Sequence, residues 1–196
     1  MNNRIAVLIS GAGTTLKALI DSQTFYGYEV GLVIASRAKV PGLDFAREAG
    51  IPWLVPPQED VFRAIDDYNI GLVCLAGYLK KLEVPEAWHG RVLNIHPSLL
   101  PLHGGQGMYG SKVHEAVYAS GAKITGCTVH YVDAEYDTGP IISQHPIFLN
   151  GSESPQQIED KVRAAERAHY PEVVRAHQLG RYHLHDGRVV VRMVGE

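Results

Sequence analysis

Short runs that are apolar at nearly every position recur along the first half of the chain, and they constrain the fold more than any other feature. A strand that alternates apolar and polar residues has one face in water, whereas a strand that is apolar throughout is buried on both faces. The runs are 5–9, 31–35, 72–76 and 92–95. Helix-like segments lie between them, at 16–20, 42–49 and 58–68. This alternation predicts the α/β class, with a doubly wound, mostly parallel sheet and right-handed crossovers.

The second half of the chain follows a different pattern. Residues 97–110 are rich in Pro and Gly and predict a long loop, which in a compact domain tends to be functional. The elements expected after it are a helix from Ser111 to Ser120, strands at 125–132 and 140–148, a long helix from 154 to about 177, and a small hairpin of 182–184 with 188–191. Ser111 is placed to cap the first helix, and Ser154 with Gln157 forms a capping box for the second. Pro171 predicts a kink in the long helix.

Composition bounds the class of protein. The chain has 196 residues, which predicts a single domain over residues 1–196. Its net charge of −3 gives no reason to expect nucleic acid as a partner. No apolar run approaches the roughly 18 residues of a membrane span, and the first run ends at a glycine loop rather than at a cleavage site. Cys74 and Cys127 lie in apolar segments, so we expect buried thiols in a reducing cytoplasm, neither paired nor bound to metal.

A glycine loop, Ser10 to Thr15, separates the first apolar run from the first helix-like segment. The N–H groups at the start of a helix lack partners and carry partial positive charge, and glycines let a phosphate approach them closely. Neither the lysine of a P-loop nor the third glycine of a dinucleotide fingerprint is present. Gly13, Thr14 and Thr15 are therefore candidates to hold a phosphate, and a tight turn with no ligand is an equally good interpretation from the sequence.

Asn94 and His96 stand at the end of the fourth apolar run. Because side chains alternate along a strand, both point to the same side, at the edge of the sheet where ligands bind in this fold class. A histidine titrates near neutral pH and can transfer protons, and an Asn amide can donate to a developing oxyanion. An Asn and a His that only hydrogen-bond the following loop fit the same spacing.

Two further acidic side chains and one more histidine are notable. Asp137 closes an acidic loop and precedes Gly139 and Pro140, a position from which a carboxylate can orient a histidine or a water, or can simply cap a turn. Glu166 shares the apolar face of the long helix, where an acid can bind a substrate amine or remain solvated. His130 lies in a strand that is otherwise apolar, and we expect it to be a structural histidine.

Taken together, these segments resemble the folate-dependent formyltransferases, and among them the branch that formylates 5-phosphoribosylglycinamide in purine synthesis. The matching segments are Ile9-Ser10-Gly11-Ala12-Gly13-Thr14, Leu75-Ala76-Gly77-Tyr78, Leu93-Asn94-Ile95-His96-Pro97-Ser98-Leu99-Leu100-Pro101, Gly126-Cys127-Thr128-Val129-His130-Tyr131-Val132 and Asp137-Thr138-Gly139-Pro140. They follow the family's order and cover nearly the whole chain. The Asn-x-His-Pro-Ser-Leu-Leu-Pro block with the later Asp-x-Gly-Pro block is the specific part, and the glycine loop points to a phosphoribosyl substrate.

The resemblance implies a Rossmann-like formyltransferase fold and transfer of the formyl group of 10-formyltetrahydrofolate, as co-substrate, to the amine of 5-phosphoribosylglycinamide. It implies that His96 is the acid/base, Asn94 the oxyanion donor and Asp137 the orienting carboxylate that keeps the imidazole basic. The remaining implied contacts are Gly13, Thr14 and Thr15 with the phosphate, Glu166 with the amine, and Leu79, Lys80, Lys81, Leu82, Asn94 and Asp133 with the folate. No metal is implied, and a cytoplasmic monomer or homodimer without nucleic-acid or membrane partners is expected.

Three positions depart from the family pattern. Thr15 stands where Asn is usual, Lys81 stands where an apolar residue usually lines the pterin pocket, and the loop 102–109 carries extra glycines. The first departure affects one phosphate contact and the second one wall of the folate pocket. We expect the glycine-rich loop to move over the active site.

Several rival functions share this pattern. The nearest is formyl transfer to methionyl-tRNA or to an amino sugar on the same fold, and the tRNA enzymes carry a further C-terminal domain. A formyltetrahydrofolate hydrolase is another, normally with an additional N-terminal domain. A ligand-binding module without catalysis is the third, and it has no need to assemble Asn94, His96 and Asp137.

Overall fold

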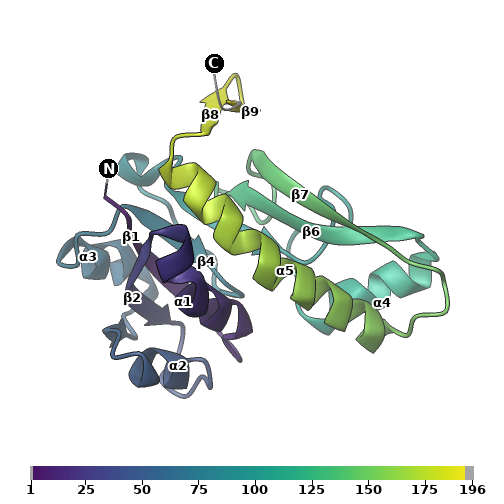
Figure 1. Ribbon diagram of the computed structural model, residues 1–196, viewed down its shortest axis with the longest axis horizontal. Helices are drawn as coiled ribbons and strands as arrows, with labels where there is room; N and C mark the ends of the chain where they lie inside the picture. Colours follow the sequence, from purple (N-terminus) through teal and green to yellow (C-terminus); the bar gives the residue numbers. More distant parts are fainter. Residues whose placement is uncertain (1, 193–196) are drawn as a thin grey trace.

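The computed structural model describes residues 2–192. Its main feature is a seven-stranded sheet in the order β3-β2-β1-β4-β5-β6-β7 (Figure 1). The strands are β1 (Arg4–Ile9), β2 (Glu29–Ala35), β3 (Trp53–Leu54), β4 (Leu72–Leu75), β5 (Val92–His96), β6 (Ile124–Tyr131) and β7 (Ile141–Phe148). β3, β2, β1, β4 and β5 pair in parallel, and β6 and β7 continue the sheet antiparallel. The predicted fold class, a doubly wound and mostly parallel sheet, is confirmed.

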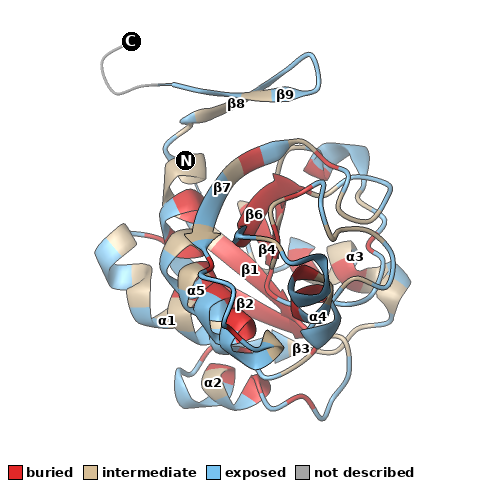
Figure 2. Cartoon of the chain, turned by 90° about the vertical axis from the view of Figure 1, so that its right-hand side faces the viewer, coloured by how far each residue is buried: buried red, intermediate tan, exposed pale blue. Residues whose placement is uncertain are grey.

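Helices cover both faces of the sheet. They are α1 (Thr14–Tyr26), α2 (Leu43–Glu48), α3 (Val61–Asp66), α4 (Ser111–Ser120) and α5 (Pro155–Gln178), with 3₁₀ turns η1 (Gln58–Asp60) and η2 (Glu86–Trp88). Successive residues of the inner strands alternate between two buried clusters, because side chains of a strand point to opposite faces. In β1, Ile5 and Val7 join the cluster beneath α1 and α5, whereas Ala6 and Leu8 join the cluster with α3. Figure 2 shows these central strands as the buried part of the molecule.

The long helix and the hairpin are present as predicted. At the start of α5, the Ser154 side chain accepts from the Gln157 N–H and the Gln157 side chain accepts from the Ser154 N–H, so the capping box is complete. The helix continues through Pro171 to Gln178. The hairpin of β8 (Tyr182–His185) and β9 (Arg188–Val191) extends away from the main sheet (Figure 1).

Two local expectations were wrong, and one strand was not predicted. The helix expected at 58–68 is a 3₁₀ turn followed by the short α3, and Asn69 leaves the helical region with φ of 51°. Ser111 is not a helix cap: Gly110 occupies that position, and no side chain caps α4. The sequence pattern also did not predict β3, because a two-residue strand has no periodicity to detect. β3 adds an edge strand beside β2, and the other two differences leave the sheet unchanged.

Both cysteines are buried and unpaired, as the sequence predicted. Burial raises the pKa of each thiol to about 12, so neither is reactive as a thiolate near neutral pH. Within residues 2–192, no helix is long and apolar enough to cross a membrane.

Candidate active site

A cavity of about 510 Å³ opens at the carboxyl ends of the parallel strands. It lies where the strand order reverses, between β1 and β4, which is where ligands bind in open α/β sheets. The loops that follow these two strands are tied together by Ser10: its N–H donates to the Gly77 carbonyl (3.1 Å), and its hydroxyl accepts from the Leu79 N–H (3.0 Å). The glycine loop and the segment expected to hold folate are therefore walls of one cavity.

The glycine loop forms the start of α1. Gly13 is the helix cap, with φ of 73°, and a Cβ placed there would lie 2.6 Å from the Gly42 Cα. Gly13 is thus required by the fold itself, whatever binds. Gly11 differs, because a Cβ at Gly11 would meet open space. Thr14 and Thr15 begin the helix and line the cavity together with both glycines.

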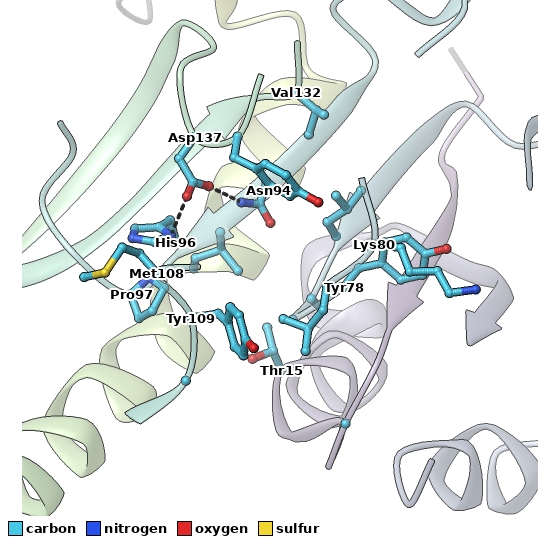
Figure 3. A pocket seen from close by; sticks show the side chains of 18 of the residues that line it. Thr15, Tyr78, Lys80, Asn94, His96, Pro97, Met108, Tyr109, Val132 and Asp137 are labelled. Atoms are coloured by element: carbon cyan, nitrogen blue, oxygen red, sulfur yellow. Dashed lines mark hydrogen bonds and ion pairs between the residues drawn. The ribbon is translucent and has the colours of Figure 1, made fainter. Parts of the chain in front are cut away.

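Asn94, His96 and Asp137 come together on one side of the cavity (Figure 3). Asn94 and His96 lie at the carboxyl end of β5, as predicted. The Asp137 carboxylate lies between them, with Oδ2 3.4 Å from His96 Nδ1 and Oδ1 3.4 Å from Asn94 Nδ2. The His96 side chain is buried and only 11% of the Asp137 side chain is exposed, so water screens these charges poorly.

The glycine-rich loop after β5 contacts both His96 and Asp137 through its main chain. His96 Nε2 lies 2.9 Å from the His103 carbonyl oxygen, and the Gly105 N–H donates to Asp137 Oδ2 at 2.9 Å. Asp137 itself is held with φ of 59°. These contacts could not be predicted from the sequence, because main-chain groups are the same in every residue type.

Burial and neighbouring groups shift the two pKa values. Burial raises the pKa of Asp137, but the interactions with His130 and His96 and the Gly105 N–H outweigh it, so the pKa lies below its ordinary value. Burial lowers the pKa of His96, and the opposing effect of Asp137 is smaller. Asp137 therefore acts on His96 in the expected direction, but the imidazole is less basic than an exposed histidine. Neutral His96 beside ionised Asp137 is the form that can accept a proton at neutral pH.

His130 was expected to be a structural histidine; it is buried with both ring nitrogens partnered, and it also lines the cavity. It lies opposite Asn94 in the β5–β6 pairing and lines the cavity. Its Nε2 is 3.0 Å from Asn94 Nδ2 and 3.5 Å from Asp137 Oδ1, while its Nδ1 is 2.8 Å from the Tyr131 carbonyl oxygen. The carbonyl can only accept, so Nδ1 carries the proton and Nε2 accepts from Asn94. The contact follows from the register of β5 against β6, which cannot be predicted from either strand alone.

Residues of α4 and α5 also line the cavity. Glu166 is 9% exposed and lines the cavity, and burial raises its pKa to about 7. Glu159 and Arg163 form an ion pair on the same helix and also line the cavity. His114 was missed by the sequence analysis: it is buried on the inner face of α4, its Nδ1 has no partner among the described residues, and burial lowers its pKa to about 4.

The segment Leu79 to Leu82 forms the wall opposite His96 and Asp137. Gln58 fixes it from behind, accepting from the Tyr78 hydroxyl (2.8 Å) and donating to the Lys81 carbonyl (2.6 Å). Lys81 Nζ lies 3.5 Å from Glu135 on the acidic loop, so the departure at Lys81 places an ion pair across the two walls. In Figure 3 the Lys80 side chain extends from the Tyr78 side, away from Asn94 and His96.

The acidic loop is ordered by its own side chains. Asp133 lines the cavity and accepts from the Thr138 hydroxyl (2.9 Å) and from the Glu135 N–H (3.2 Å).

Every residue predicted for the phosphate, amine, folate and catalytic sites therefore lines the same cavity. Between residues 2 and 192 no three His, Cys, Asp or Glu side chains are grouped to hold a metal ion.

Known proteins resemble this chain in sequence and in fold. The family model described as "Formyl transferase" matches residues 3–174. The chain belongs to the formyl transferase family. Among curated relatives, this formyltransferase is 36% identical to the chloroplastic phosphoribosylglycinamide formyltransferase of Arabidopsis thaliana, over 88% of the chain and 64% of that protein. It is 37% identical to the trifunctional purine biosynthetic protein adenosine-3 of Gallus gallus, over 86% of the chain and 18% of that protein. The chain thus spans less than two thirds of each of these two relatives.

Solved structures extend the comparison over whole chains. The formyltransferase superposes on phosphoribosylglycinamide formyltransferase from Anaplasma phagocytophilum with a TM-score of 0.89 and 34% identity, covering 100% of this chain and 97% of that one. A formyltetrahydrofolate deformylase from Pseudomonas syringae has a TM-score of 0.85 at 25% identity, and the match covers 66% of its chain. The fold is therefore shared with enzymes of both names, and the whole-chain match and the higher identity lie with the first.

Proposed function

We propose that this formyltransferase moves the formyl group of 10-formyltetrahydrofolate to the amine of 5-phosphoribosylglycinamide. The observation that carries the proposal is the group formed by Asn94, His96 and Asp137, with His96 buried and the other two partly buried, at one side of a cavity whose other side is a glycine loop at a helix start. A phosphate at one end and a reacting carbon at the other fit one elongated substrate. The printed names of the relatives support the same reaction.

At the phosphate end, the proposed contacts are main-chain N–H groups at the start of α1 with the hydroxyls of Thr14 and Thr15. Gly11 permits the close approach, and Gly13 shapes the turn. The proposed partner of the amine end is Glu166, whose carboxylate attracts the ammonium form of the substrate. Because the pKa of Glu166 is about 7, an approaching cation favours its ionised form.

The folate is proposed to lie between the two loops that face each other across the cavity. Leu79, Lys80, Lys81 and Leu82 supply one wall, and Asp133 with its neighbours supplies the other. The exposed Leu79 offers apolar surface, and main-chain groups of these loops can recognise the edge of a heterocyclic ring. Asn94 lies between these walls and the reacting carbon.

The neutral amine forms when the substrate ammonium passes one proton to the Glu166 carboxylate, whose pKa is about 7. The chemical step then requires three events. The substrate amine nitrogen attacks the formyl carbon, and the carbonyl π electrons move to oxygen, where an Asn94 N–H donates to the new negative charge. The other Asn94 N–H donates to His130 Nε2 at 3.0 Å, so the N–H in the longer contact, 3.4 Å from Asp137 Oδ1, is the one proposed to be shared with the oxyanion. His96 takes the proton from the attacking nitrogen, and Asp137 stabilises the imidazolium that results. The carbon–nitrogen bond to folate then breaks, and His96 returns the proton to the departing nitrogen.

The test measures transfer and hydrolysis separately. The protein is mixed with a 10-formyl folate analogue alone, with 5-phosphoribosylglycinamide, and with an amino sugar or methionyl-tRNA, and deformylation is followed by absorbance. We expect deformylation only with 5-phosphoribosylglycinamide, together with the formylated product. Deformylation without an amine would favour the hydrolase, and binding of both ligands without any reaction would favour a binding module. His96→Ala serves as the control for contaminating activity.

A further inference from the structure

The two ring nitrogens of His96 have different partners, and the difference fixes where the proton is. Nε2 lies 2.9 Å from the His103 carbonyl oxygen, whereas Nδ1 lies 3.4 Å from Asp137 Oδ2. A carbonyl oxygen can only accept a hydrogen bond, so Nε2 must carry a proton to make this contact. A neutral imidazole has one N–H, and Nδ1 is then the unprotonated, basic nitrogen.

We infer that the main-chain carbonyl of His103 is a positioning group that holds His96 as the Nε2–H tautomer, so that Nδ1 is the atom that takes and returns the proton. The inference deepens the proposed function and rests on it for the role of His96 in transfer. It assigns a task to the glycine-rich loop, whose sequence departs from the family pattern. The tautomer itself is a property of the free protein and can be measured without substrate.

The opposite tautomer is disfavoured by the shorter of the two contacts. With the proton on Nδ1, the Nε2 lone pair would face the His103 oxygen at 2.9 Å inside a buried site, and two acceptors would repel each other. With the proton on Nε2, the Nδ1 lone pair faces Asp137 at the longer distance of 3.4 Å. That carboxylate already accepts from the Gly105 N–H and lies beside Asn94, which reduces its repulsion of the lone pair. When Nδ1 gains a proton, the new N–H points at the carboxylate, and both contacts become attractive.

Ser98 fixes the carbonyl in place. This side chain is fully buried, and its hydroxyl donates to the carbonyl of Leu102, the residue before His103. The Thr128 hydroxyl donates to the Ser98 carbonyl (2.6 Å) and accepts from the Leu100 N–H (3.0 Å), which ties the turn to β6. His103 is held with φ of 53°, in the left-handed region that a side chain rarely adopts. These bonds over-determine the turn and aim the His103 carbonyl at the ring.

The deciding experiment is ¹⁵N NMR of the histidine-labelled wild-type protein at pH 8, with His96→Gln used to assign the His96 signals. We expect the spectrum of His96 to show a proton on Nε2 and an unprotonated Nδ1. A proton on Nδ1, or an averaged signal from both tautomers, overturns the inference. If the wild type shows the Nε2–H tautomer but transfers no formyl group, the positioning geometry stands and the proposed function fails.

A variant pair tests the part played by Ser98. Ser98→Ala removes the hydroxyl that holds the turn, and Ser120→Ala removes a comparable hydroxyl-to-carbonyl bond at the end of α4, away from the cavity. For Ser98→Ala we expect the His96 signals to shift toward a mixture of tautomers and kcat to fall about fivefold, the loss of one hydrogen bond. The KM of the phosphate substrate should stay unchanged, and Ser120→Ala should behave as wild type. A fall in kcat with an unchanged tautomer would mean that Ser98 is merely structural and would overturn its positioning role, as would wild-type behaviour of Ser98→Ala. If Ser98→Ala does not fold, the wild-type spectrum still decides the tautomer.

Discussion

Asn94 on β5 pairs directly with His130 on β6, and its side-chain amide lies 3.0 Å from the His130 ring. This contact joins a parallel strand to the first antiparallel strand at the floor of the cavity. Since His130 Nδ1 is committed to the Tyr131 carbonyl, its Nε2 can only accept, which sets the direction of the Asn94 amide. His130 is therefore a positioning residue for the oxyanion donor.

Replacing His130 by Phe should preserve the bulk of the ring but remove the acceptor for Asn94. We expect kcat to fall by about tenfold, because an amide that can rotate stabilises the oxyanion less well. Binding of the phosphate substrate, measured by titration, should not change. Wild-type kcat in His130→Phe would mean that Asn94 is oriented by Asp137 alone.

The acid/base pair should respond more strongly. We expect His96→Ala to lose roughly 10²- to 10⁴-fold in turnover, the range for a general acid/base. Asp137→Asn keeps the side-chain shape but removes the charge, and turnover should fall by at least roughly 10²-fold. Both variants should bind folate and phosphate substrate as the wild type does, because the lost interactions matter mainly in the transition state. Single-turnover rates paired with titrations make the test; equal transfer by wild type and Asp137→Asn would reduce Asp137 to a turn residue.

The glycine loop offers three variants with different expected outcomes. Gly13→Ala should lower the melting temperature whether or not a phosphate binds, because the new Cβ meets Gly42 and φ is 73°. Gly11→Ala should leave the melting temperature unchanged but weaken phosphate binding by at least about tenfold, because the methyl group blocks close approach. Thr15→Ala should cost only roughly 0.5–1.5 kcal/mol of binding, one neutral hydrogen bond. Unchanged affinity in Gly11→Ala would argue against a phosphate at this loop.

Local patterns predicted the elements that are defined locally. The inner strands were detectable because they are apolar on both faces, and the start of α5 was detectable because Ser154 and Gln157 bond each other within one turn. The pairing of Asn94 with His130 was not detectable, since it depends on the register of two strands separated by a long loop. His114 was overlooked for a similar reason: its position on α4 reads as core, and only the fold reveals that the core there borders the cavity.

No sequence pattern could predict the contacts of the glycine-rich loop. His103 and Gly105 act through main-chain groups, which every residue possesses, so no residue type marks them. The extra glycines did signal an unusual backbone, and Gly105 and Gly107 indeed have φ of 92° and 87°. Only the structure shows which groups this backbone contacts, namely His96 and Asp137.

The ion pair between Lys81 and Glu135 should contribute little to folate binding. Both side chains are at least half exposed, and pairs of this kind are worth about 0–1 kcal/mol. We expect Lys81→Met to change the Kd of a folate analogue by less than about fivefold, and the charge-reversed double variant Lys81→Glu/Glu135→Lys to match the wild type at low salt. The pair Lys17–Asp21 on α1, which is also about half exposed, provides the matched control. A loss much above tenfold in Lys81→Met would mean that Lys81 contacts the ligand itself.

Glu166 should show opposite effects on stability and on binding. Burial raises its pKa from 4.5 to about 7, so the folded protein holds a proton that the unfolded chain releases between these two values. The free energy of unfolding therefore falls as pH rises from about 4.5 to about 7, and the cost of the buried charge is fully present above pH 7. Glu166→Gln has no such charge. We expect the variant to be more stable than the wild type by roughly 1–3 kcal/mol at pH 8, and the difference to vanish below pH 4.5, as measured by urea unfolding at several pH values.

The same variant should bind 5-phosphoribosylglycinamide more weakly, because the partner of its amine is gone. Glu172→Gln, on the exposed side of α5, is the control and should change neither property. If the difference in free energy of unfolding between Glu166→Gln and the wild type is the same at pH 8 and at pH 4, Glu166 is not buried as a charge. If the substrate affinity of the variant is unchanged, Glu166 is not part of the amine site.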